Sequence, residues 1–136
     1  MSVLLKGVSI LVVEDDADTR ELLRILLQGD GGSVTATGSV QEALSAYDQS
    51  PPDVIVADIG MPEYNGYTLI GRVRARDREH GRVTPAIALT AYATSSDRDT
   101  VLSTGFQVHM PKPFEPDKLI SVVAGLAAKY KQSNAD

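Results

Sequence analysis

Short apolar runs alternate with amphipathic segments along the chain. The apolar runs have the length of strands and occupy 8–13, 33–37, 53–57, 86–90 and 107–110. The segments between them have helical character and cover 17–28, 39–48, 65–76, 95–104 and 115–131. Regular alternation of strand and helix is typical of a parallel sheet with helices on both faces. The pattern predicts an α/β fold with a doubly wound, five-stranded parallel sheet.

The apolar content of each run predicts its place in the sheet. The runs 8–13 and 53–57 are almost continuously apolar, as central strands are, whereas the more polar 33–37 and 107–110 suit the edges. The strand order 2-1-3-4-5 satisfies these preferences and places the first and third strands side by side. Functional residues of such sheets lie beyond the carboxyl ends of the strands.

Local signals mark several helix ends. We expect Asp16 and Ser39 to be N-caps, the latter with Glu42 at the spacing of a capping box, and Gly105 to be a C-cap. In the first helix, the leucines at 22, 23, 26 and 27 form one stripe that we expect to be buried.

Length and composition limit the classes of protein. The 136 residues favour a single domain, with its core at about 8–128 and flexible ends at 1–6 and 132–136. The sequence has no cysteine, which excludes disulfides and thiolate metal sites, and no apolar run of membrane-spanning length. A net charge of −5 argues against general nucleic-acid binding. We expect a cytoplasmic protein that binds neither membrane nor nucleic acid.

The strand ends carry the candidate chemistry. Glu14 and Asp15 follow the first strand, Asp58 the third, Thr90 ends the fourth, and Lys112 follows the fifth. Carboxylates a few ångströms apart disfavour one another's ionised form, and a hard cation such as Mg²⁺ with oxygen ligands relieves this. The chain has no glycine-rich phosphate loop of the GxxxxGK[ST] type. We call this group of residues at the carboxyl ends of the strands the rim, and its composition predicts a cation site.

This ordered set resembles the receiver domain of two-component response regulators. The matching residues are Glu14-Asp15, Asp58, Met61-Pro62 with Gly66, Thr90-Ala91 and Lys112-Pro113-Phe114. The resemblance extends over about 8–128 and implies a flavodoxin-like (βα)₅ fold. It implies that a phosphohistidine of a histidine kinase or a histidine phosphotransfer protein phosphorylates Asp58.

The resemblance also implies the roles of the neighbouring residues. Mg²⁺, for which Mn²⁺ can substitute, would be held by Glu14, Asp15, Asp58 and the backbone carbonyl of Gly60. Thr90 and Lys112 would neutralise phosphoryl oxygens. Glu14 stands where the family more often has Asp, so we expect it to reach the metal through a water.

Three further expectations concern the lysine, the switch and the phosphoryl lifetime. The family has a cis peptide before the proline that follows Lys112, and we expect one here. His109 replaces the usual aromatic residue that moves together with Thr90. Gly60 and Tyr92 occupy positions that influence hydrolysis of the acyl phosphate, and we expect slow dephosphorylation.

The expected function is a switch that catalyses its own phosphorylation and is not a conventional turnover enzyme. Phosphorylation would shift the face formed by 95–104, 107–110 and 115–131, which an output partner or domain reads. The sequence leaves open whether a homodimer forms through that face. Ile25, outside the buried stripe of its helix, is a candidate docking point for the phosphohistidine partner.

Other functions fit less well or remain open. A haloacid-dehalogenase-type phosphatase would need a second acid where Gly60 stands, and a flavodoxin-like electron carrier would need a hydroxyl-rich first loop. A receiver-like scaffold that works without phosphorylation remains the alternative. The chain is either a stand-alone receiver or part of a hybrid histidine kinase or other multidomain protein, and Leu5-Lys6-Gly7 resembles the linker before hybrid-kinase receivers.

Overall fold

A computed structural model of the chain describes residues 4–58, 66–91 and 95–133, without the side chains at 66, 67, 96, 97, 132 and 133. Strands and helices alternate through these ranges. Their bounds are β1 (Ser9–Val13), α1 (Ala17–Gly29), β2 (Ser33–Thr37), α2 (Val40–Gln49), β3 (Val54–Asp58), α3 (Gly66–His80), β4 (Ala86–Thr90), α4 (Ser95–Thr104), β5 (Val108–Pro111) and α5 (Pro116–Ser133).

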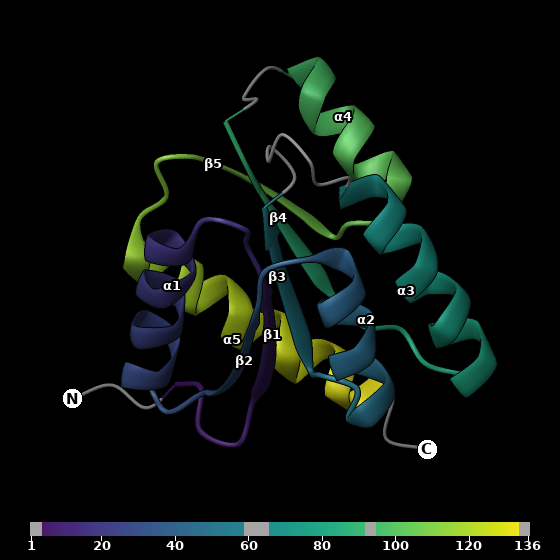
Figure 1. Cartoon of the computed structure of the whole chain (residues 1–136), viewed down its shortest axis with the longest axis horizontal. Coiled ribbons are helices and arrows are strands. Elements are labelled where there is room, and N and C mark those ends of the chain that lie inside the picture. The colour runs from purple at the N-terminus through teal and green to yellow at the C-terminus, as the bar shows by residue number, and fades with distance from the viewer. Residues whose placement is uncertain (1–3, 59–65, 92–94, 134–136) are drawn as a thin grey trace.

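The strands form one parallel sheet of order β2-β1-β3-β4-β5, which confirms the predicted order. Helices α1 and α5 lie on one side of the sheet, and α2, α3 and α4 lie on the other (Figure 1). Because every strand runs in the same direction, the carboxyl ends of β1, β3, β4 and β5 share one edge.

Two apolar cores fill the space between sheet and helices. Alternate residues of one strand enter different cores: in β3, Ile55 packs on the α2–α3 side and Val56 on the α1–α5 side. Every residue of β3 and of β4 is buried, whereas β2 at the sheet edge alternates between exposed and covered positions. This difference explains why β3 reads as an almost continuous apolar run and β2 does not.

The helix caps follow the sequence signals. Asp16 accepts a hydrogen bond from the Thr19 amide at 2.9 Å, and Ser39 Oγ accepts one from the Glu42 amide at 3.1 Å. Gly105, directly after α4, has a φ of +127°, a value that favours glycine. The three predicted caps are thus confirmed. Helix α3 continues four residues beyond its predicted end, because its last turn has no glycine or proline to stop it.

One expectation about the leucines of α1 is wrong, and the N-terminal turn adds a buried leucine to the core. Leu23 and Leu27 are buried as predicted, but Leu22 is 54% exposed, because the side of α1 that meets the sheet is narrower than the stripe. Leu5, in a segment that we expected to be flexible, is fully buried in the α1–α5 core. Its amide donates a 3.0 Å hydrogen bond to the carbonyl of Asp30, which ties the N-terminal turn to the end of α1.

A buried polar network joins the helices on the α2–α3 side. Asp77 accepts hydrogen bonds from Tyr47 Oη at 2.6 Å, the Thr84 amide at 2.8 Å and Arg74 Nη1 at 2.7 Å. Arg74 Nη2 also donates to the carbonyl of Gly105 at 2.7 Å. Burial and the hydrogen bond to Asp77 raise the pKa of Tyr47 to about 12. The network lies at the amino ends of the strands, opposite Asp58.

Candidate functional site

Three of the predicted site residues are buried at the carboxyl edge of the sheet. Asp58 is the last residue of β3, Glu14 follows β1 directly, and Thr90 is the last residue of β4. Their exposed fractions are 5%, 1% and 0%. Each of these polar residues directly ends or follows an apolar strand. The packing of that strand between the two cores therefore sets the position of the polar group at the rim.

Lys112 joins this cluster from the segment after β5. Its ammonium forms an ion pair and a hydrogen bond with Asp58, and it lies 3.7 Å from Glu14 Oε1. The Lys112 amide donates to the Thr90 carbonyl at 2.8 Å, which fixes the backbone beside β4. The Lys112–Pro113 peptide bond is cis, as predicted.

Glu14 has the most perturbed electrostatics of this group. Burial raises its pKa to about 7, and the neighbouring Asp58 carboxylate adds to that rise. Its Oε2 accepts a 3.3 Å hydrogen bond from the Asp16 amide, but its Oε1 is buried without a hydrogen-bond partner. Burial by itself lowers the pKa of Lys112, yet the hydrogen bond to Asp58 and the charges of Asp58 and Glu14 raise it above its usual value.

This donor set fits a hard cation. Two buried carboxylates face each other, one of them has an unsatisfied oxygen, and a cation relieves both costs. Asp15, the next predicted ligand, is exposed on the rim. Among the described residues, no three His, Asp or Glu side chains are gathered closely enough to form a metal centre by themselves. Gly60, whose carbonyl we expected to contribute, lies outside the described residues.

The two residues predicted to switch together lie on one face of the sheet. Ala88 in β4 packs on the α2–α3 side and Met110 in β5 on the α1–α5 side. Alternation along the strands therefore puts Thr90 and His109 both on the side covered by α4. His109 is half-buried and pairs with Ala88.

A groove beside Lys112, which the sequence did not predict, adds an apolar surface to the rim. Its volume is about 490 Å³, and its lining residues are Thr19, Leu22, Leu26, Lys112, Pro113, Phe114 and Pro116. Ile25, the predicted docking residue, is 56% exposed on the same helix α1. Tyr92, predicted to affect dephosphorylation, lies outside the described residues.

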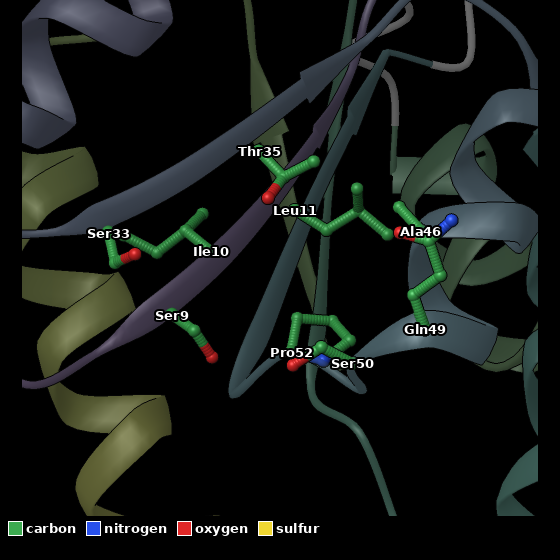
Figure 2. A pocket seen from close by; sticks show the side chains of 9 residues that line it. All are labelled: Ser9, Ile10, Leu11, Ser33, Thr35, Ala46, Gln49, Ser50 and Pro52. Carbon is green, nitrogen blue, oxygen red and sulfur yellow. The ribbon is translucent and has the colours of Figure 1, made fainter.

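A second cavity lies away from this chemistry. It has a volume of about 170 Å³ and opens between the starts of β1 and β2 and the end of α2 (Figure 2). Ser9, Ser33, Thr35, Gln49 and Ser50 supply polar groups, and none of the described residues that line it carries a charge. Because Ser9 begins β1 while Glu14 follows its end, this cavity is at the opposite edge of the sheet and is not the candidate site.

Comparison with known proteins gives one consistent result. The family model of the response regulator receiver domain matches residues 10–124. An uncharacterized 14.6 kDa protein of Leptolyngbya boryana is 46% identical over 88% of this chain and 89% of its own length. The hybrid signal transduction histidine kinase D of Dictyostelium discoideum is 33% identical over 93% of this chain, which spans 9% of that protein.

A solved structure supports the same relationship. The receiver domain of the Francisella response regulator 1452 superposes with a TM-score of 0.82 and 28% identity, covering 90% of this chain and 98% of that one. None of the helices in the described part of the chain combines the length and the apolar character that a membrane span requires.

Proposed function

The chain belongs to the response-regulator receiver family, and from this membership and the site we propose that it is a signalling switch controlled by phosphorylation of Asp58. One observation carries the proposal: Asp58 is buried at a strand end and is held by the ammonium of Lys112, beside Glu14. Receiver domains interact with histidine kinases and output domains, so the donor in this proposal is a phosphohistidine.

The proposed step is a phosphoryl transfer to a carboxylate. An Oδ atom of Asp58 forms a bond to phosphorus while the P–N bond of the donor phosphohistidine breaks, and the electron pair stays on the imidazole nitrogen. Such transfers depend on position and on neutralised charge. The buried end of β3 holds Asp58 in place, the Lys112 ammonium offsets charge on the phosphoryl oxygens, and the Thr90 hydroxyl donates to another oxygen.

Receiver domains generally use Mg²⁺, and in our proposal Glu14, Asp15 and Asp58 hold it, together with the carbonyl of Gly60. The ion would offset negative charge shared by the carboxylates and the phosphoryl group. The raised pKa of Glu14 and its unsatisfied Oε1 support this assignment. That Glu14 reaches the ion through a water remains a prediction, as does substitution by Mn²⁺.

The proposed switch runs from Thr90 to the face formed by α4, β5 and α5. The shared sheet face of Thr90 and His109 supports a coupled movement, in which phosphorylation shifts the balance between two conformations. A partner or output domain would bind that face, and the chain would also be able to form a homodimer through it. The same proposal includes a cytoplasmic location for the protein.

The apolar groove beside Lys112 is the proposed docking surface for the phosphohistidine partner. Leu22, which lines the groove, is 54% exposed, and Ile25, three residues further along α1, is 56% exposed and would extend the docking surface beyond the groove. Ile25→Ser should slow transfer from a protein donor and leave transfer from acetyl phosphate unchanged, because only the protein covers this surface. The Dictyostelium relative makes a hybrid kinase one proposed context, and the stand-alone receiver is the other.

Acetyl phosphate with Mg²⁺ tests the central claim. Intact mass should show one phosphoryl adduct on the wild type and none on Asp58→Asn, whose amide is not nucleophilic. Asp48→Asn, an exposed acid far from the rim, is the control and should retain the adduct. An adduct that survives Asp58→Asn would refute the assignment. Absence of an adduct on the wild type would favour the scaffold alternative.

The lifetime of the adduct is a separate part of the proposal. A glycine at position 60 has no side chain to orient a water, and Tyr92 would shield the acyl phosphate, so dephosphorylation should be slow. Gly60→Asn should accelerate the decay of the adduct more than Gly60→Ala does. Faster decay in Gly60→Ala than in Gly60→Asn would contradict this explanation.

A further inference from the structure

The Arg20 side chain turns back from α1 towards the acidic loop between β1 and α1. Its Nη1 donates to the carbonyl of Glu14 at 2.9 Å and approaches the carbonyl of Asp15 at 3.4 Å. These carbonyls belong to the residues whose carboxylates are the proposed cation ligands. Residue patterns could not reveal this contact, because its acceptors are backbone atoms that every residue possesses.

The rest of the loop is held by other hydrogen bonds. The Glu14 amide donates to the carbonyl of Thr37 at 2.9 Å, and Asp16 caps α1 by accepting from Thr19. Arg20 therefore supplies a donor for the Glu14 carbonyl, between two segments that are already fixed. It also places a positive charge next to a run of three acidic residues.

Gly38, on the neighbouring β2–α2 connection, leaves room for the guanidinium. A Cβ atom at position 38 would stand 2.8 Å from Arg20 Nη1, which is too close for a side chain in its present place. Gly38 is not among the glycines with positive φ, so space and not backbone conformation explains it. An alanine here would displace the flexible end of Arg20 and disturb little else.

We propose that Arg20 is a positioning residue for the cation site. It holds the Glu14–Asp15 backbone so that both carboxylates are presented at the rim, and the bare Gly38 allows its guanidinium to reach that backbone. The inference rests on the proposed function and adds to it a residue that touches neither phosphoryl group nor cation. Partners of this kind commonly contribute about tenfold or more to metal affinity.

Arg24 offers a matched control on the same helix. Its guanidinium pairs with Glu21 and donates to Gln28 on the surface of α1, one turn beyond Arg20. Arg24→Met removes the same charge and the same number of donors without touching the acidic loop.

Direct Mn²⁺ binding, followed by electron paramagnetic resonance, tests the proposal on the whole chain. Arg20→Met and Gly38→Ala should each raise the dissociation constant about tenfold, whereas Arg24→Met should stay within about twofold of wild type. In acetyl phosphate assays the half-saturating Mg²⁺ concentration should rise while the rate at saturating Mg²⁺ stays nearly unchanged. Wild-type affinity in either Arg20→Met or Gly38→Ala overturns the proposal.

A second measurement separates this proposal from the cation site itself. Amide hydrogen exchange is recorded in EDTA, where no cation contributes. Exchange in residues 14–16 should accelerate about tenfold in Arg20→Met and Gly38→Ala, with α5 unaffected. Equal acceleration in α5 would indicate general destabilisation, and unchanged exchange in the loop would remove the positioning role; either result overturns the proposal. A wild type that binds no Mn²⁺ but shows the loop effect refutes only the proposed metal site.

Discussion

Glu14 Oε1 and Lys112 Nζ lie 3.7 Å apart, although they follow strands β1 and β5, which are not neighbours in the sheet. The lysine crosses the ends of β3 and β4 to reach this position, and on the way it pairs with Asp58. Three ionisable groups from three strands therefore depend on one another's charge. The first two predictions follow from this arrangement.

Glu14→Gln should make the protein less sensitive to pH in the absence of divalent cations. The pKa of Glu14 is about 7 in the folded protein and ordinarily 4.5, so between these values the folded state binds the extra proton. The stability of the wild type should therefore fall as pH rises through this window, and the fall should end above about pH 7.

Urea unfolding in EDTA checks this prediction. At about pH 8 the free energy of unfolding of Glu14→Gln should exceed that of the wild type by roughly 1–3 kcal/mol, because the wild type must then keep a buried carboxylate ionised beside Asp58 and each unit of pKa shift corresponds to about 1.4 kcal/mol. The difference should shrink towards about pH 5, where Glu14 is protonated in the folded state. A difference that does not change with pH would assign the effect to packing.

Mg²⁺ should stabilise the folded chain through the acidic rim. A ligand at a hundred times its dissociation constant adds about 2.7 kcal/mol to the free energy of unfolding. Thermal unfolding of the wild type should shift upward with Mg²⁺, and the shift should be largely lost in Asp58→Asn. Potassium chloride at matched ionic strength is the control, and an equal Mg²⁺ shift in both proteins would place the cation elsewhere.

Asp77→Ala should destabilise the chain far more than Asp48→Ala does. The Asp77 side chain is 3% exposed and anchors the buried network, and removing it leaves Arg74 without its buried counter-charge. Such losses cost about 3–5 kcal/mol. Asp48 also pairs with an arginine but is 53% exposed, and exposed pairs contribute less than about 1 kcal/mol. Denaturant titration of both variants gives the comparison.

Leu5→Ala should lower the free energy of unfolding by about 2–5 kcal/mol, as is usual for buried leucines. Leu4, its neighbour, is 59% exposed, and Leu4→Ala should change stability by less than about 0.5 kcal/mol. The pair measures whether the N-terminal turn is part of the core. If both variants changed the free energy of unfolding by the same small amount, the N-terminal turn would not be a stable part of the core.

Much of the fold and part of the site could be predicted from local patterns. The alternation of apolar runs and helical segments predicted the sheet order, and the caps at Asp16, Ser39 and Gly105 marked helix ends that the structure confirms. The placement of Asp58 and Lys112 at one rim followed because parallel strands align their carboxyl ends. These features depend on residue type and spacing, which the sequence states directly.

Burial was predicted less well for single residues. Leu5 and Leu22 are both leucines, yet the first is enclosed and the second is exposed, because the neighbouring elements decide which surface is covered. The network around Asp77 escaped prediction for a related reason: its members are far apart in the chain, and each of them alone looks like an ordinary polar residue.

The sequence by itself determined which chemical groups stand at the strand ends, since an apolar strand followed by an acid, a hydroxyl or an amine delivers that group to the rim. Only the tertiary structure decided how these groups affect one another. Glu14 has a raised pKa because the fold buries it beside Asp58, and Arg20 reaches the loop because Gly38 leaves space. Both effects depend on distances between distant segments and on backbone acceptors, which residue types do not encode.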